Sequence, residues 1–278
     1  MKYLAARCLN PHSLLLRLCF AAALAWVLAG CADAGRVGTQ SGGKTDVMTA
    51  SDEPDVRRRA SIRLELAVSY FSEGKTTFAL DELKQSLVID PSYAQAHNLR
   101  GLVYMQLGDF KLAEESFRRA MALDPNDAGV VQNYGWLQCQ SGRFGEATDT
   151  FNQALANPQY RDRAKTYLTM GLCQSKAGHA EEAERSLLRS YELDAGNPIT
   201  GFNLASSLFK RGELARAQFY IRRLNNSELA NAESLWLGIK VERRLDSAVA
   251  MQQLVEQLKK RFPQARELSL YERGAFDD

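Results

Sequence analysis

The chain has 278 residues, with 35 Lys and Arg against 33 Asp and Glu, and a formal net charge of +2. Three of the basic residues, Lys2, Arg7 and Arg17, lie in the first thirty residues, which contain no acidic residue. Without that segment the chain has 32 basic and 33 acidic residues, a charge of about −1. This balance offers no electrostatic basis for binding nucleic acid or anionic lipid, so recognition of a protein partner through shape and apolar contact is expected.

Residues 1–30 have the organisation of a secretory signal. A basic region ends at Arg17, and the apolar run that follows it, Leu18–Leu28, is too short to span a bilayer. The next residues, Ala29-Gly30-Cys31, complete a segment that resembles the lipobox of bacterial lipoproteins, in which the cysteine is lipidated. The resemblance implies a lipid on Cys31 and, because Ala32 is not aspartate, sorting to the outer membrane with the rest of the chain facing the periplasm. An ordinary signal peptide with a cysteine nearby is the alternative.

The segment after the cysteine predicts a tether. Up to about Glu53 it is rich in Gly, Ser and Thr and has almost no large apolar residue, so it cannot bury a core. We therefore expect residues 31–59 to form a lipidated N-terminus and a flexible linker. Arg57, Arg58 and Arg59 at its end are interpreted as a solvated face.

Residues 94–127 form a unit of two amphipathic helices. Gly108-Asp109 separates two apolar patterns of helical period, and Pro125 ends the second. The small Gly101 and the bulky Phe117 occupy positions where two helices must come close. This is the pattern of the tetratricopeptide repeat, whose period is about 34 residues.

Similar units precede and follow this one, so the predicted fold is an all-α tetratricopeptide superhelix. The expected repeats cover residues 60–93, 94–127, 128–163, 164–197, 198–230 and 231–264. The third is about two residues longer than its neighbours, the sixth is degenerate, and residues 265–278 are expected to cap the array with a short helix. Each unit leaves an apolar face that its neighbour covers.

The sequence predicts no enzyme, metal site or cofactor. The three histidines, His12, His97 and His179, occupy unrelated positions, and no nucleophile, phosphate-loop or zinc motif is present. Cys139 and Cys173 fall on the first helices of adjacent repeats. Packed helix axes lie about 8–10 Å apart, whereas a disulfide needs Cα atoms within about 7 Å, so these cysteines are predicted to be free thiols.

By resemblance to other tetratricopeptide arrays, the first helix of each repeat lines a concave groove. The positions that would face it carry an apolar stripe with few charges, which favours a hydrophobic partner segment laid into the groove. An interpretation of some of these residues as packing between repeats stays open. The candidate groove residues are Leu64, Val68, Phe71, Leu102, Met105, Trp136, Leu168, Leu172, Phe202 and Phe209.

Three segments carry a more specific resemblance. They are QNYGWLQCQSGRFGEA at 132–147, NAESLWLGIKVERRLDS at 231–247 and LKKRFPQARELSLYERGAF at 258–276. With the lipobox, the tether and six repeats, they resemble the PilF/PilW family of type IV pilus biogenesis lipoproteins. In the last segment, Lys259, Lys260 and Arg261 are interpreted as a solvated face.

The resemblance implies a pilotin. Such a protein would bind the pilus secretin subunit, escort it to the outer membrane and promote its multimerisation, with no small-molecule substrate and no nucleic acid. The early repeats are favoured for the contact. The alternative is a structural adaptor in another envelope-assembly complex, whose deletion would not specifically abolish pili.

Overall fold

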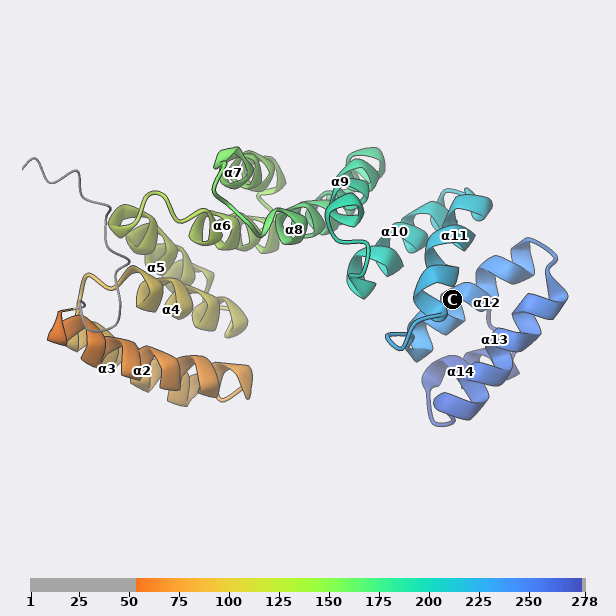
Figure 1. Ribbon diagram of the computed structural model, residues 1–278, viewed down its shortest axis with the longest axis horizontal. Coiled ribbons are helices and arrows are strands. Elements are labelled where there is room, and N and C mark those ends of the chain that lie inside the picture. The colour runs from red at the N-terminus through yellow and green to blue at the C-terminus, as the bar shows by residue number, and fades with distance from the viewer. Residues whose placement is uncertain (1–53, 277–278) are drawn as a thin grey trace, which may run out of the picture. The chain divides into compact units, whose positions relative to one another are not determined.

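A computed structural model describes residues 54–276, and these form an all-helical array (Figure 1). The predicted signal, Cys31 and the predicted tether up to residue 53 lie outside the described residues. The helices are α2 (Asp55–Ser72), α3 (Thr76–Ile89), α4 (Ala94–Gln106), α5 (Phe110–Leu123), α6 (Ala128–Gln140), α7 (Phe144–Ala156), α8 (Arg163–Lys176), α9 (Ala180–Leu193), α10 (Pro198–Lys210), α11 (Leu214–Asn225), α12 (Ala232–Arg244), α13 (Ala248–Arg261) and α14 (Arg266–Glu272). Residues 54–276 contain no strand, so the all-α fold class is confirmed.

The helices pack as six consecutive pairs, α2 with α3 through α12 with α13. The second helix of each pair contacts the first helix of the next, and α14 packs against α12 and α13. First helices also contact each other directly from α2 to α4, α4 to α6, α6 to α8 and α10 to α12. The side chains of these first helices therefore form a continuous row along much of the array.

Tight turns join the two helices of each pair. Gly108, at φ 78°, follows α4, and equivalent glycines of positive φ follow α2, α6, α8 and α10. The sixth pair uses Asp246 instead, at φ 54°, in a left-handed region that aspartate tolerates better than most residues. Several helices then begin on a side-chain cap. Asp109 Oδ1 accepts from the Leu112 backbone N–H at 3.0 Å.

Within a pair, glycine allows the two helices to approach. A Cβ added at Gly101 would lie 2.7 Å from the ring of Phe117, and one at Gly135 would lie 2.9 Å from the ring of Phe151. Both rings are completely buried. The glycine of the first helix therefore packs directly against the phenylalanine of the second helix. This contact sets the distance between the two helices of a pair.

Candidate functional site

The predicted groove residues lie on the first helices α2, α4, α6, α8 and α10. Val68 on α2 is 50% exposed, and most of the others are half-buried, with one side of the side chain packed on the core. The half-buried residues are Leu64, Phe71, Leu102, Met105, Trp136, Leu172, Phe202 and Phe209. These side chains both stabilise the stacking of repeats and present apolar surface.

Leu168 differs from the other candidates. It is 7% exposed and packs in a cluster with Leu187 and Leu204, so it lies in the core between repeats and offers no contact surface. Its neighbour Leu172, one turn further along α8, instead lines a cavity of about 270 Å³ with Ser206 of α10. The surface of the row of first helices therefore has a cavity between α8 and α10.

Hydrogen bonds between consecutive first helices fix the row. Asn133 Nδ2 on α6 donates to Asn98 Oδ1 on α4 at 3.1 Å, and Lys176 Nζ on α8 donates to Gln140 Oε1 on α6 at 3.2 Å. These polar contacts stand among the apolar side chains. They hold adjacent repeats in register, and the Asn98–Asn133 contact does so without adding charge to the stripe.

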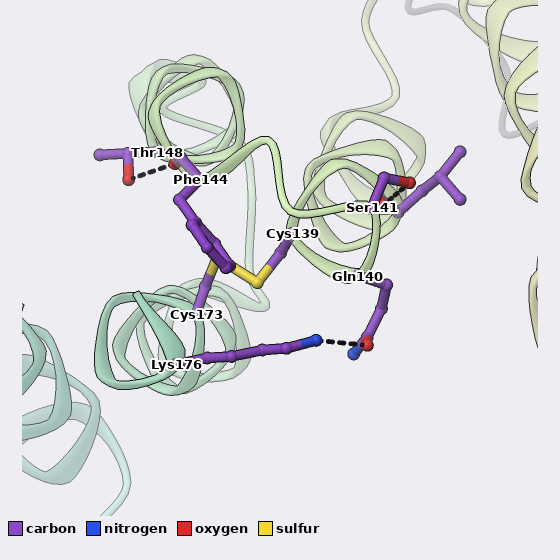
Figure 2. Close-up of a disulfide and its surroundings, with 8 residues drawn as sticks. Cys139, Gln140, Ser141, Phe144, Thr148, Cys173 and Lys176 are labelled. Carbon is purple, nitrogen blue, oxygen red and sulfur yellow. Dashed lines mark hydrogen bonds between the residues drawn. A yellow bond between two sulfur atoms is a disulfide. The ribbon is translucent and has the colours of Figure 1, made fainter. Parts of the chain in front are cut away.

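The prediction of free thiols at Cys139 and Cys173 is wrong. The two cysteines form a disulfide between α6 and α8, with Cα atoms 5.8 Å apart (Figure 2). The distance between helix axes overestimates the separation of facing backbones, because the Cα atoms lie about 2.3 Å from each axis. Phe144 of α7 packs beside the disulfide. The third and fourth helix pairs are therefore covalently joined along the predicted groove.

The interpretation of Arg57 as part of a solvated face is also wrong. Its guanidinium pairs with Asp90 and stacks over the ring of Tyr93, 4.4 Å from the centroid. Burial would raise the pKa of Asp90, but hydrogen bonds from Ser92 and Arg57 outweigh it and lower that pKa. Arg57 therefore ties the first helix to the turn after α3.

His97 is buried, with Nε2 3.0 Å from the Pro91 carbonyl oxygen, and burial lowers its pKa. His179 precedes α9, with a largely exposed side chain 3.1 Å from Glu182. His97 therefore packs between helices, whereas His179 lies on the surface. No cluster of three potential metal ligands occurs within residues 54–276.

A pocket that the sequence reasoning missed lies near the end of the array. It has a volume of about 250 Å³ and is lined by Phe209 of α10, Lys240, Arg243 and Arg244 of α12, and Phe276 after α14. In the sequence, Arg243 and Arg244 stand out only as a basic pair on an expected helix. Phe276 gave no signal, because the chain folds back only after α14.

The sequence and the fold have known relatives. Sequence profiles described as "Tetratricopeptide repeat" and "TPR repeat" match residues 94–127 and 69–108. The curated "Type IV pilus assembly protein PilF" of Pseudomonas aeruginosa is 28% identical over 242 residues, which cover 87% of this chain and 94% of that protein.

Two solved structures agree. A crystal structure of PilW, described as a widely conserved type IV pilus biogenesis factor, has a TM-score of 0.69 at 30% identity, over 77% of this chain and 98% of its own. The structure of Pseudomonas aeruginosa PilF has a TM-score of 0.67 at 27% identity, over 78% of this chain and 99% of its own. The chain therefore belongs to the PilF/PilW family of tetratricopeptide proteins of type IV pilus biogenesis.

Proposed function

We propose that this protein is a lipid-anchored pilotin of the outer membrane, which binds the type IV pilus secretin subunit and promotes its assembly. Membership of the PilF/PilW family carries the proposal. The apolar side chains along the first helices supply a physical means of binding, because they are only partly covered by the core. No turnover is required, since the protein acts by holding a partner.

The binding surface would be the row of first helices, and its early part is the favoured contact. Val68 and Phe71 of α2 and Leu102 and Met105 of α4 leave apolar surface uncovered, and Trp136 of α6 extends the row. A partner segment laid along this row, as a helix or an extended strand, would cover that surface. Aromatic side chains at such positions are the usual energetic anchors of an interface. A covered secretin segment would also be protected from aggregation.

The anchor is the second part of the proposal. Lipid on Cys31 would hold the chain at the outer membrane and place the groove in the periplasm. Several acyl chains, each contributing about 0.8 kcal/mol per buried CH₂, make such an anchor firm. Among residues 54–276 no helix has the length and hydropathy to cross a bilayer. The Cys139–Cys173 disulfide supports a location outside the cytosol, since structural disulfides persist in the bacterial periplasm.

Anchoring would raise the local concentration of bound subunits. Secretin subunits delivered to one membrane surface would meet more often than free subunits, which favours ring formation. The protein therefore needs to bind the subunit and carry the lipid, and each requirement can be removed separately.

Val68→Asp is expected to reduce the amount of secretin that co-purifies with this protein by about tenfold or more, because it places a charge in the apolar contact. Val68 is 50% exposed, so the substitution is expected to change folding stability by no more than about 0.5 kcal/mol. The measurement is quantitative co-purification from detergent-solubilised membranes.

Val88→Asp is the matched control. Val88 lies on α3, a second helix of a pair, and is 81% exposed, so the same change of side chain is made away from the row of first helices. Secretin recovery equal to wild type is expected for this variant. Equal recovery with Val68→Asp would show that the early row does not make the contact.

A further inference from the structure

The pocket near the end of the array combines three cations with aromatic walls. Arg243 lies over the ring of Phe276, with Cζ 3.8 Å from the centroid, and Arg244 lies over Phe209 at 5.1 Å. Lys240 contributes its ammonium 5.9 Å from the centroid of Phe209. The aromatic rings hold the guanidinium groups in place while leaving their N–H donors directed outward.

A turn specific to the chain's last residues builds one wall. After α14, Gly274 adopts φ 68°, and the Ala275 backbone N–H donates to the Leu270 carbonyl oxygen at 2.9 Å. The reversal brings Phe276 onto Trp236 of α12, where the two rings stack with their centroids 5.2 Å apart. The aromatic wall is therefore fixed by packing.

Among the described residues, the two arginines of the pocket are not paired with an acid, unlike several arginines elsewhere in the array. Arg222 and Arg216, for example, pair with Glu242 and Glu184. Within residues 54–276, no carboxylate lies within ion-pair distance of Arg243 or Arg244. Glu242, between them and α11, is 1% exposed and directs its carboxylate to Arg222 and Gln218. Their positive charge is not neutralised by a neighbouring acid of the described array.

We propose that this pocket binds an acidic segment of the protein that occupies the groove. The inference rests on the proposed function, because it names the chemistry of one part of that partner. Phe209 is a predicted groove residue and also a wall of the pocket, so the two surfaces are continuous. The partner segment would be apolar along the early repeats and carry Asp or Glu where it reaches Arg243 and Arg244.

The aromatic walls favour a carboxylate side chain of a peptide over phosphate. Guanidinium groups bind carboxylate and phosphate alike through paired hydrogen bonds. A peptide also offers side-chain methylene groups and apolar neighbours that can pack on Phe209 and Phe276, whereas free phosphate would leave these rings uncovered.

Binding of a labelled peptide to the purified mature protein tests the pocket directly. The probe is a fluorescein-labelled hexapeptide of alternating glutamate and leucine, followed by fluorescence anisotropy, and its counterpart has lysine in place of glutamate. Wild type is expected to bind the acidic peptide and not the basic one. Arg243→Glu/Arg244→Glu is expected to weaken acidic-peptide binding by about tenfold or more. Both arginines are exposed, so the fold is expected to be retained.

Arg119→Glu/Arg185→Glu is the control of equal charge. Both residues are exposed, on α5 and α9, and the variant is expected to bind within about twofold of wild type because only the distant field changes. If both double variants bind the acidic peptide equally weakly, the proposed binding at the pocket is wrong, and the weakening reflects only the change in net charge. Displacement of the peptide by inorganic phosphate or phosphatidylglycerol vesicles as efficiently as by unlabelled peptide would overturn the peptide assignment.

Asp277 and Asp278 follow Phe276 in the sequence and lie outside the described residues. Asp277→Asn/Asp278→Asn is expected to bind the acidic peptide as tightly as wild type or more tightly. Weaker binding would contradict a cationic pocket that receives carboxylates from a partner.

Secretin recovery separates this inference from the proposed function. If wild type retains secretin and the Arg243→Glu/Arg244→Glu variant retains less than the control variant, both stand. If the two double variants retain secretin equally, the acidic-segment inference fails and the pilotin proposal survives. If wild type retains no secretin, the pilotin proposal fails, whether or not the pocket binds the acidic peptide.

Discussion

Removal of the Cys139–Cys173 disulfide is expected to lower the free energy of unfolding by about 3–4 kcal/mol, because the bridge closes a loop over a sequence separation of 34 residues and restricts the unfolded chain. The Cys139→Ser/Cys173→Ser variant should therefore unfold at a lower urea concentration than the oxidised wild type. Circular dichroism during urea denaturation makes the comparison. Both cysteines are buried, so the serine hydroxyls add a smaller cost of their own.

Reduction controls for that smaller cost. Treatment with a thiol reductant should lower the free energy of unfolding of wild type to nearly that of the double serine variant. The variant itself should not respond to the reductant. A wild type whose unfolding midpoint is the same with and without reductant would contradict a stabilising disulfide. The loss is expected to be largest in the third and fourth helix pairs, which hydrogen exchange would resolve.

Arg222→Ala is expected to destabilise the fold by about 2–4 kcal/mol, since it leaves a buried carboxylate without its cation. Glu242 is 1% exposed, and its two oxygens accept from Arg222 Nε at 2.7 Å and Arg222 Nη2 at 3.0 Å. The hydrogen bond to Glu242 raises the pKa of Arg222. Gln218 Nε2 remains as a donor at 2.9 Å, and it cannot neutralise the charge. Urea denaturation measures the change.

The pair is asymmetric, which gives a sharper test. Arg222 is 48% exposed on its side chain, so Glu242→Leu leaves a cation that water can solvate. We expect Glu242→Leu to cost less than Arg222→Ala, and the double variant to be more stable than Arg222→Ala alone. Arg119→Ala, on an exposed helix face, serves as the control and should change stability by no more than about 0.5 kcal/mol. A double variant less stable than Arg222→Ala would contradict the account of a stranded carboxylate.

The repeat architecture was predictable because its signals are local. Gly101 and Phe117 recur at fixed spacing, and a turn glycine such as Gly108 separates the helices, so the pattern specifies helix pairs without any knowledge of distant contacts. The family resemblance rested on the same kind of signal in longer segments. These predictions needed only the residues of one unit and its neighbour.

Contacts between helices distant in the sequence were harder to predict. The disulfide was missed because a generic distance between helix axes replaced the distance between facing Cα atoms. Arg57 appeared solvated because Asp90, its partner, lies at the end of the next helix. Leu168 fits the pattern of the groove, yet it turns into the core formed with the following repeat. In each case the missing information was how one helix packs against another that is distant in the sequence.

The pocket of Arg243, Arg244 and Phe276 shows the same limit at the end of the array. Its arginines are adjacent in the sequence, but the aromatic wall comes from a chain reversal at Gly274. A basic pair on a helix most often indicates a solvated face. Only the stacking of Phe276 on Trp236 distinguishes a built pocket from such a face.

The central claim is that this protein delivers the secretin to the outer membrane, and membrane fractionation of the secretin tests it most directly. Three strains are compared: wild type, a deletion of the gene, and Cys31→Ala. The account predicts heat-resistant secretin multimers in the outer membrane of wild type only, with monomers accumulating at the inner membrane of the other two strains. Normal multimers in all three would contradict the pilotin assignment and favour an adaptor in another envelope complex.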